Sequence, residues 1–256
     1  KYTVRDSLFS NDYDFRFNTH SGGMNFRLNE KKLMLSLGTN IAAADFKQTD
    51  LRKDSSYTYS FVNFFPRATF RYNFSQQRRI SLNYNGNTKQ PTLEQIQPIR
   101  ENTDPLNIQI GNPVLKQEFR HHISLTFNDF KVLTGRGIWI SGNFNYIDNA
   151  ISSSTDVKNG VRTTQYVNVA GNFTSSAWAG YWMQFKKIKM NVGLNLGANY
   201  SKFNNFINGL KNVNDNRSLN LNANISHDKE NKYNFYMNPG FAMNYSRSSI
   251  NRDAVT

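Results

Sequence analysis

The alternation of apolar with small polar residues, at a period of two, constrains the fold of this chain more than any other feature. It is clearest from Met190 to Ser201, where apolar side chains alternate with Asn, Gly and Ser, and it recurs in Leu33–Ile41, Leu219–Ser226 and Tyr233–Tyr245. Successive side chains of a strand point to opposite faces, so each stretch has one apolar face and one polar face. No stretch sustains a helical period. The sequence therefore predicts an all-β protein.

Counting such stretches predicts about ten antiparallel strands, several of them longer than the roughly 9–11 residues that a membrane-spanning strand needs. They are expected near 12–28, 33–45, 58–74, 79–88, 119–130, 137–151, 162–185, 189–204, 216–228 and 232–250. Short connections alternate with long ones, and the long ones are predicted at 45–57, 88–118, 152–161 and 204–215. In an up-and-down meander this puts tight turns at one end and long loops at the other, as in outer-membrane β-barrels.

The first predicted strand departs from a single alternation. Its apolar residues fall on odd positions at Phe15 and Phe17 but on even positions at Met24 and Phe26, on either side of Ser21–Gly23. One extra residue at a glycine is typical of a β-bulge, so a bulge is predicted there.

Composition and the polar faces favour a membrane barrel over a soluble sheet. Aromatic residues make up 14% of the chain, yet its mean hydropathy is −0.65 and no apolar run approaches the roughly 18 residues of a membrane helix. The polar faces carry few charges, unlike the outer face of a soluble sheet. The apolar faces gather aromatic residues near strand ends, as in interfacial girdles; these are Phe70, Tyr72, Phe74, Tyr181, Phe185 and Tyr200. A soluble sheet with cross-strand aromatic pairs remains the alternative.

Three segments between Gln90 and Glu118 resemble a motif of TonB-dependent outer-membrane receptors. They are Gln90–Ile99 (QPTLEQIQPI), Asp104–Asn107 (DPLN) and Gly111–Glu118 (GNPVLKQE). In this form the motif is most similar to that of the Bacteroidetes-type, TonB-dependent-receptor-like outer-membrane β-barrel family. Flanking pieces that also fit are Ser10–Phe15, Lys31–Gly38 and Gln165–Asn172. The sequence departs from the family at Gln117, where Pro is usual, which loosens a turn.

The resemblance implies a larger antiparallel up-and-down transmembrane β-barrel of about 22 strands that encloses a plug. Residues 1–256 would be a partial barrel domain from the C-terminal half, without the plug, the TonB box or the closing strand. Lys1–Val4 does not resemble an initiator region, and we expect a longer protein around this chain. The implied location is the bacterial outer membrane, where the wall would contact lipid and lipopolysaccharide and TonB would act through the plug.

Two groups of residues are candidates for a site. The motif loop is expected to fold back into the barrel mouth in a structural role, because its prolines set extended or turn geometry; its residues are Pro91, Leu93, Pro98, Asp104, Pro105, Gly111, Asn112, Pro113, Leu115 and Glu118. The second group is expected to face the lumen, on a solute path or against a plug; it comprises Arg67, Arg71, Trp178, Trp182, Asn195 and Asn222.

Other chemistry is not indicated. The chain has no Cys, which excludes disulfides and thiolate metal sites. His121 and His122 would point to opposite faces of a strand, so they cannot hold one metal ion together. No catalytic or nucleotide-binding motif occurs, and we expect neither a cofactor nor enzymatic activity. The net charge is +13, but the basic residues are scattered, which suits lipid head groups, plug carboxylates or an anionic solute better than nucleic acid.

Two functions stay open at this point. The first is import of a solute across the outer membrane, energised by TonB. The second is a non-transporting barrel that serves as a scaffold or partner subunit of an envelope assembly, together with surface lipoproteins or other envelope proteins. A plug and a TonB box in the full-length gene would favour import. A soluble β-rich binding module is a third hypothesis, which detergent-free solubility of the intact protein would support.

Overall fold

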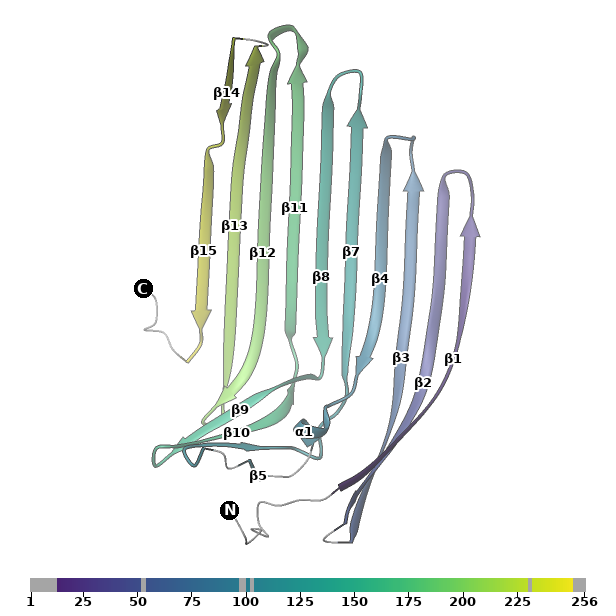
Figure 1. Ribbon diagram of the computed structural model, residues 1–256, viewed down its shortest axis with the longest axis vertical. Helices are drawn as coiled ribbons and strands as arrows, with labels where there is room; N and C mark the ends of the chain where they lie inside the picture. Colours follow the sequence, from purple (N-terminus) through teal and green to yellow (C-terminus); the bar gives the residue numbers. More distant parts are fainter. Residues whose placement is uncertain (1–12, 52–53, 97–99, 102–103, 230–231, 251–256) are drawn as a thin grey trace.

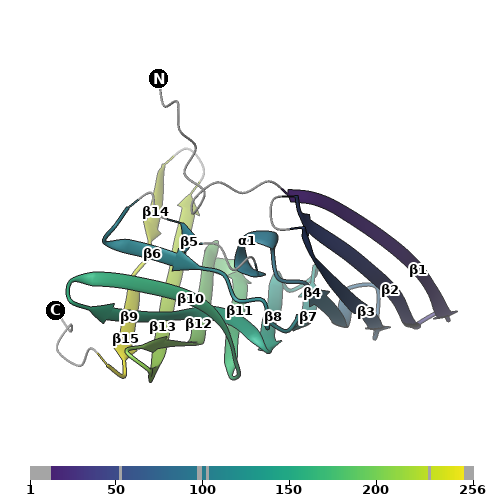
Figure 2. The same ribbon diagram turned by 90° about the horizontal axis from the view of Figure 1, so that it is seen from below.

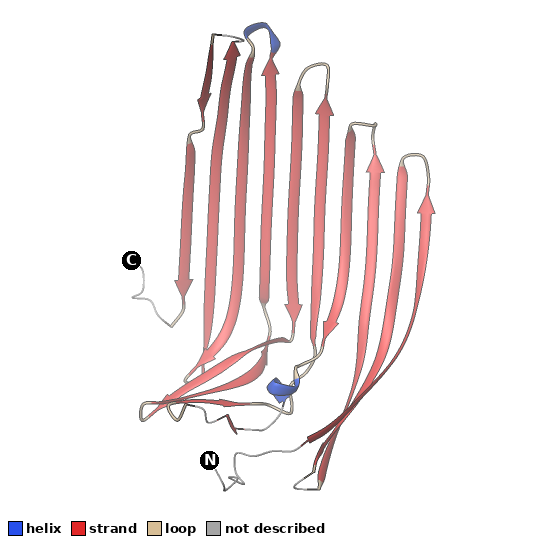
Figure 3. Cartoon of the chain, in the orientation of Figure 1, coloured by secondary structure: helices blue, strands red, loops and turns tan. Residues whose placement is uncertain are grey.

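The structure is a computed structural model that describes residues 13–51, 54–96, 100–101, 104–229 and 232–250. Its strands form one tall, curved, open wall (Figure 1, Figure 3). The wall strands are β1 (Tyr13–Asn29), β2 (Leu33–Asp50), β3 (Ser55–Asn73), β4 (Arg78–Lys89), β7 (Glu118–Lys131), β8 (Arg136–Asp148), β11 (Asn172–Phe185), β12 (Met190–Ile207), β13 (Leu210–Lys229), β14 (Tyr233–Met237) and β15 (Gly240–Ser248). The other elements are α1 (Leu93–Ile96), β5 (Arg100–Glu101), β6 (Asn107–Ile110), β9 (Ala150–Lys158), β10 (Val161–Val169) and the 3-10 turn η1 (Lys186–Ile188). Among the described residues, no helix has the length and apolar character needed to cross a membrane.

The wall is an antiparallel meander, in which each wall strand pairs with the next one along the chain. Strands β14 and β15 both pair with β13 in one continuous register, and they are a single strand interrupted at Asn238 and Pro239. Counted so, the described part of the wall has ten strands, and the predicted all-β, antiparallel fold class is confirmed. Pro239 has no N–H to donate, and its place on an edge strand makes that loss tolerable.

The two ends of the wall differ, but less regularly than predicted (Figure 1). Short turns join the strands at the upper end. At the lower end the predicted loop 204–215 is wrong, because β12 and β13 continue to a two-residue turn of Asn208 and Gly209. Both turn residues have positive φ, 49° and 75°, as a type I′ hairpin requires. The predicted loop 45–57 is also shorter, since β2 ends at Asp50 and β3 begins at Ser55.

The predicted strand 162–185 is in fact two strands, and the predicted loop 152–161 belongs to a hairpin. Strand β9 pairs with β10, and the chain then turns at Ala170 and Gly171 before β11 begins. Gly171 has a φ of +86°, which glycine adopts without strain. The two-residue alternation continues across this turn in the sequence, which is why the pattern conceals the break.

The predicted bulge in β1 is wrong. Strands β1 and β2 pair residue for residue along their whole length, without an unpaired residue at Ser21–Gly23. The apolar positions change parity because the buried face of the sheet changes. Phe17 lies directly opposite Phe46 on β2, and the rings of Phe15 and Phe46 lie 5.2 Å apart. Near the lower end of the wall these side chains point toward a core.

This core lies between the lower end of the sheet and the segment that links β4 to β7. Phe46, Ile96 and Leu115 are its buried centre, and they are surrounded by Tyr59, Phe61, Ile151 and Tyr166. We call the face of the sheet that carries Phe46 the inner face. It is the hollow side of the curved wall, on which α1 lies (Figure 2). The opposite face is the outer face.

Pro66 ends the pairing of β3 with β4 just above this core. The ladder between the two strands runs only from Arg67 to Asn73, because Pro66 cannot donate a bond. The Thr88 hydroxyl replaces it: it accepts a hydrogen bond from the N–H of Phe64 (2.8 Å) and donates one to the Phe64 carbonyl (3.1 Å). Gly86 leaves the room that the Pro66 ring occupies. The lower ends of β1, β2 and β3 therefore separate from the rest of the wall (Figure 1).

Candidate functional site: the inner face of the wall

The inner face is the surface that the strand register builds from every second residue. Residues that lie opposite each other in an antiparallel pair point to the same side, so the register can be followed from strand to strand. All of the residues predicted to line a lumen lie on this face; they are Arg67, Arg71, Trp178, Trp182, Asn195 and Asn222. The structure thus brings side chains from β3, β11, β12 and β13 onto one surface.

The three tryptophans of the chain all lie on the inner face, each one opposite a glycine of the neighbouring strand. The pairs are Trp139–Gly180, Trp182–Gly137 and Trp178–Gly197. A Cβ added at Gly180 or Gly137 would overlap the facing ring, and one added at Gly197 would come within 3.0 Å of the Trp178 ring. Each ring therefore covers backbone that a larger residue would occupy, which stabilises a glycine in a strand.

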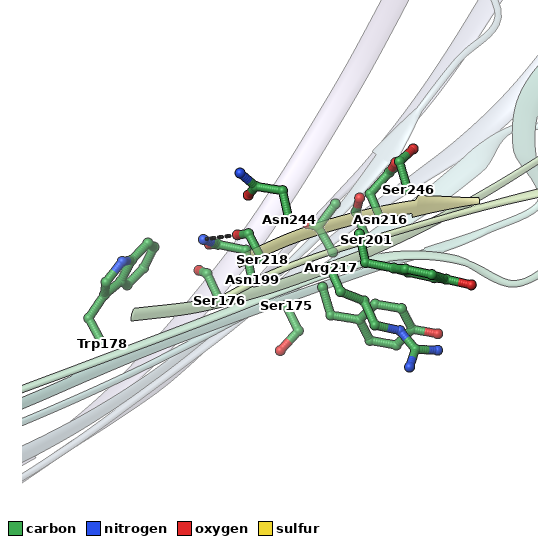
Figure 4. Close-up of a pocket in the computed structure, with 13 residues that line it drawn as sticks. Ser175, Ser176, Trp178, Asn199, Ser201, Asn216, Arg217, Ser218, Asn244 and Ser246 are labelled. Atoms are coloured by element: carbon green, nitrogen blue, oxygen red, sulfur yellow. Dashed lines mark hydrogen bonds between the residues drawn. The ribbon is translucent and has the colours of Figure 1, made fainter. Parts of the chain in front are cut away.

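Between β11 and β15 the inner face is an amide and hydroxyl surface. Most residues that line an open hollow of about 770 Å³ belong to it, and Tyr200, Arg217 and Tyr245 of the opposite face also line the hollow. Figure 4 shows Trp178, Ser176, Asn199 and Ser218 on one side of the sheet, while Arg217 lies on the other. The Asn199 amide donates a hydrogen bond to the Ser218 hydroxyl across the strands (3.1 Å). Such side chains both donate and accept hydrogen bonds, so this surface can bind polar, uncharged groups or water.

Toward β1 the inner face is cationic instead. Besides the predicted Arg67 and Arg71 it carries Arg27 on β1 and Arg79 on β4. The sequence analysis did not single out Arg27, Arg79 or Trp139. Their positions in the alternation, opposite the apolar residues of the same strands, would have identified all of them.

The motif loop folds back over the inner face, and its first turn is a capping box around α1. The N–H of Gln95 donates to the Thr92 hydroxyl (3.4 Å), and the N–H of Thr92 donates to Gln95 Oε1 (2.9 Å). This reciprocal pair satisfies two backbone donors of a short helix. It aims Ile96, which is 1% exposed, at Phe46 and the rest of the core.

The second half of the motif loop is held by the Gln165–Asn172 segment. The Asn112 side chain donates to the Tyr166 carbonyl (2.8 Å). Asn168 clamps Lys116, accepting from its N–H (2.7 Å) and donating to its carbonyl (2.9 Å). Gln117, at the position where proline is usual, donates its side-chain amide to Asn63 on the inner face (3.1 Å). Two segments that resemble the family thus contact each other, and these contacts give both of them a structural role.

The remaining motif residues occupy turns and strand ends. Pro91 and Gly111 are buried, whereas Leu93, Pro105 and Pro113 are exposed, and Pro98 lies outside the described residues. Hydrogen bonds from the Asn107 side chain and from the N–H of Leu106 hold the pKa of the Asp104 carboxyl below its usual range. Buried Glu118 accepts from the N–H of Ile151 (2.7 Å) and pairs with Arg120 (2.6 Å).

The outer face carries a continuous apolar band across the wall. One row of directly opposed residues runs over seven strands: Ile80, Phe127, Ile140, Ala179, Leu196, Leu221 and Phe241. Two rows nearer the lower end the band gives way to Tyr200, Arg217 and Tyr245. The Arg217 guanidinium lies 5.0 Å from the Tyr200 ring centroid and 6.0 Å from that of Tyr245. An exposed apolar band of this extent needs an apolar environment.

The adjacent histidines lie on opposite faces of β7. His121 is on the outer face, 3.1 Å from the Tyr84 hydroxyl and 3.0 Å from Asp148 Oδ2. His122 is on the inner face, where its Nδ1 lies 2.6 Å from Asn145 Oδ1. Within the part of the chain that the structure describes, no three His, Cys, Asp or Glu side chains come together in a way that could hold a metal ion.

Comparison with known proteins assigns the family. The model of the outer membrane protein beta-barrel family matches residues 1–253. The chain belongs to this family. Its expected location, the bacterial outer membrane, is thereby confirmed. The outer membrane transporter YddB from Escherichia coli is a similar solved structure, with 14% sequence identity and a TM-score of 0.37 over 91% of this chain and 34% of that chain. The chain thus spans about a third of the length of YddB. A search of curated protein sequences finds no match.

Membership of the outer membrane β-barrel family explains the outer face. On β12 the apolar residues run from Met190 to the aromatic row at Tyr200, which is ten residue steps or about 33 Å of strand. At a tilt of about 40° this corresponds to about 25 Å along the membrane normal, the height of the apolar band of such barrels. The apolar band therefore matches the hydrocarbon core of the membrane, and Tyr200 and Arg217 lie where the head groups begin.

Proposed function

We propose that this chain is a section of an outer-membrane transporter that imports a solute, with energy supplied by TonB through a plug. The observation that carries the proposal is the inner face, which is polar along the height of the apolar band and hollowed beside Trp178 and Asn199. A barrel that served only as an anchor could fill its interior with apolar side chains. Membership of the outer membrane β-barrel family and the motif resemblance support the proposal.

The proposal includes the rest of the barrel and its surroundings. The described residues supply ten strands of a larger wall whose concave side, including Arg67, Trp178 and Asn222, faces the lumen. Outer-membrane lipid and lipopolysaccharide contact the outer face, with phosphate groups near Arg217. Passage of a solute needs no catalytic residue or cofactor in this chain, and we propose none.

Deletion of the full-length gene tests the import function. Untargeted mass spectrometry of periplasmic extracts would be compared between the deletion strain, the complemented strain and a strain without TonB. We expect at least one solute to be depleted in the deletion strain, restored on complementation and depleted again without TonB. If a solute is depleted in the deletion strain but not in the strain without TonB, import is supported and TonB is refuted as its energy source.

The scaffold function predicts the opposite pattern. No solute would change in the deletion strain, and the full-length protein would co-purify in fixed proportion with a surface lipoprotein or another envelope protein. That pair of results would replace the import proposal with a scaffold.

A further inference from the structure

The charge on the inner face is divided between its two halves. Among the described residues, the inner faces of β8, β11, β12 and β15 carry no charged side chain, and that of β13 carries only Asp228, close to a turn. The arginines lie on the other half, and we call Arg27, Arg67, Arg71 and Arg79 the arginine stripe.

The register places the arginine stripe along the strand direction. Arg67, Arg27, Arg71 and Arg79 occupy four successive inner-face levels on β1, β3 and β4. Levels are two residues apart, so the stripe extends over about 20 Å. Arg71 and Arg79 are diagonal neighbours on adjacent strands, a relation that puts their Cα atoms about 7–8 Å apart.

The stripe has no counter-charge within the described part of the chain. None of its members takes part in an ion pair there. Arg79 donates to the Asn73 side chain (3.0 Å), Arg27 contacts the Met34 sulfur (3.5 Å), and the buried Nε of Arg71 has no hydrogen-bond acceptor. On the inner face of the neighbouring β7, Glu118 is already paired with Arg120. Four guanidinium groups so placed repel one another and attract an anion.

The stripe ends in a cationic hollow. An open hollow of about 530 Å³ at the upper end of the wall is lined by Lys31, Lys32 and Arg79, together with Asn73, Ser75 and Gln76. Three cations with amide and hydroxyl donors between them suit an oxyanion. The hollow thus continues the stripe beyond the strands.

We propose that the arginine stripe and this hollow bind an organic solute that carries two or more phosphate, sulfate or carboxylate groups, and that the solute moves along them. Guanidinium groups bind such oxyanions with two parallel hydrogen bonds. A series of separate cationic levels lets a solute exchange one site for the next, which passage through a pore requires. This inference rests on the proposed import function and names the class of its solute.

Calorimetric titration of the detergent-purified full-length protein tests the inference. The probes are tripolyphosphate, citrate and, as a neutral control, maltotetraose. We expect one or both anions to bind, with an affinity that falls as salt is added, and maltotetraose not to bind. Changing Arg67 and Arg71 together to Gln should weaken anion binding at least about tenfold. The preference between tripolyphosphate and citrate distinguishes a phosphate-type from a carboxylate-type solute.

Two further variants keep the test decisive. Arg247→Gln removes an exposed cation from the outer face of β15, and it should change anion affinity less than about twofold. If the double variant does not fold, Arg27→Gln removes one exposed member of the stripe, whose side chain donates to the Met34 sulfur and forms no ion pair among the described residues. Two results would overturn the inference: no anion binding at all, or equal anion affinity in the stripe variants and in Arg247→Gln. Absence of binding is the result expected if acidic groups elsewhere in the protein cover the stripe.

The two proposals fail in different ways. If only uncharged compounds are depleted, and the stripe variants do not change this, the import function is supported and the proposal of an anionic solute is refuted. If anions bind but no solute is depleted, the anion site is supported and the import function is refuted.

Discussion

The middle of the wall and the lower ends of β1, β2 and β3 are parts of the same sheet, yet their polarity is reversed. In the middle the outer face is apolar, with Leu194 and Leu221, and the inner face carries Asn195 and Asn222. At the lower ends the inner face buries Phe46, while Lys47 beside it is exposed on the outer face. The outer face of the middle meets lipid, whereas the inner face of the lower ends packs into a core, as one face of a water-soluble sheet does. The comparison teaches that the environment on each side of a strand, rather than the strand itself, decides which face is apolar.

The largest effect is expected where the lower end is most tightly packed. Phe46→Ala should cost about 3–5 kcal/mol, because it removes a ring that is 4% exposed and contacts Tyr59 and Phe61 (centroids 4.7 and 5.6 Å). Urea unfolding of the lipid-reconstituted full-length protein measures the cost, and protease cleavage within 88–118 reports whether the motif loop detaches. Lys47→Ala is the matched control and should stay within about 0.5 kcal/mol. Similar losses of unfolding free energy in both variants would contradict the proposal that the inner face is the buried one at the lower end.

A charge introduced on either face of the middle tests the reversal from the other side. Leu194→Arg should cost about 2–4 kcal/mol, because it places a cation in the apolar band, whereas Asn195→Arg should cost clearly less. Leu221→Arg and Asn222→Arg repeat the comparison on β13. The same unfolding measurement applies, and equal costs on the two faces would contradict the assignment of the outer face to lipid.

A smaller effect is expected from a substitution on the inner face of the middle, where tryptophan rings pack against glycines although the face is polar. Gly180→Ala should cost about 1–3 kcal/mol, because the added methyl group overlaps the Trp139 ring. Gly193→Ala, on the inner face of the next strand, meets its nearest atom at 3.5 Å and should be close to neutral. Trp fluorescence would follow the displaced ring. If Gly180→Ala is as neutral as its control, the rings do not cover the glycines.

The smallest effect concerns the turn at Asp104, within the motif loop at the lower end of the wall. The folded-state pKa of Asp104 is lowered, so its contribution to the turn is present above the unfolded pKa of about 3.9 and is lost as the pH falls through the folded value. Hydrogen exchange of the Leu106 amide should therefore become less protected in acid. Asp104→Asn should remove this pH dependence, and an unchanged acid response in that variant would assign it to another group.

How far the sequence predicts this molecule differs between the two regions. In the middle, the alternation places strands and faces correctly, because one side of every strand meets lipid and the other does not. At the lower end the same alternation misleads. The parity change around Gly22 suggests a bulge, and the hairpin of β9 and β10 is hidden by an unbroken pattern on either side of Gly171. The hydrogen bonds between Asn168 and Lys116 join segments 52 residues apart, and no local pattern predicts such a contact.

By itself, the sequence determined that this protein is an antiparallel sheet with an apolar and a polar face, since side-chain direction repeats every two residues whatever surrounds the strand. Which side is buried at each height was decided only by the tertiary structure, because burial depends on what packs against the sheet. The register alone placed four arginines of three strands in one stripe and set each tryptophan over a glycine. These are relations between strands, and a one-dimensional pattern does not contain them.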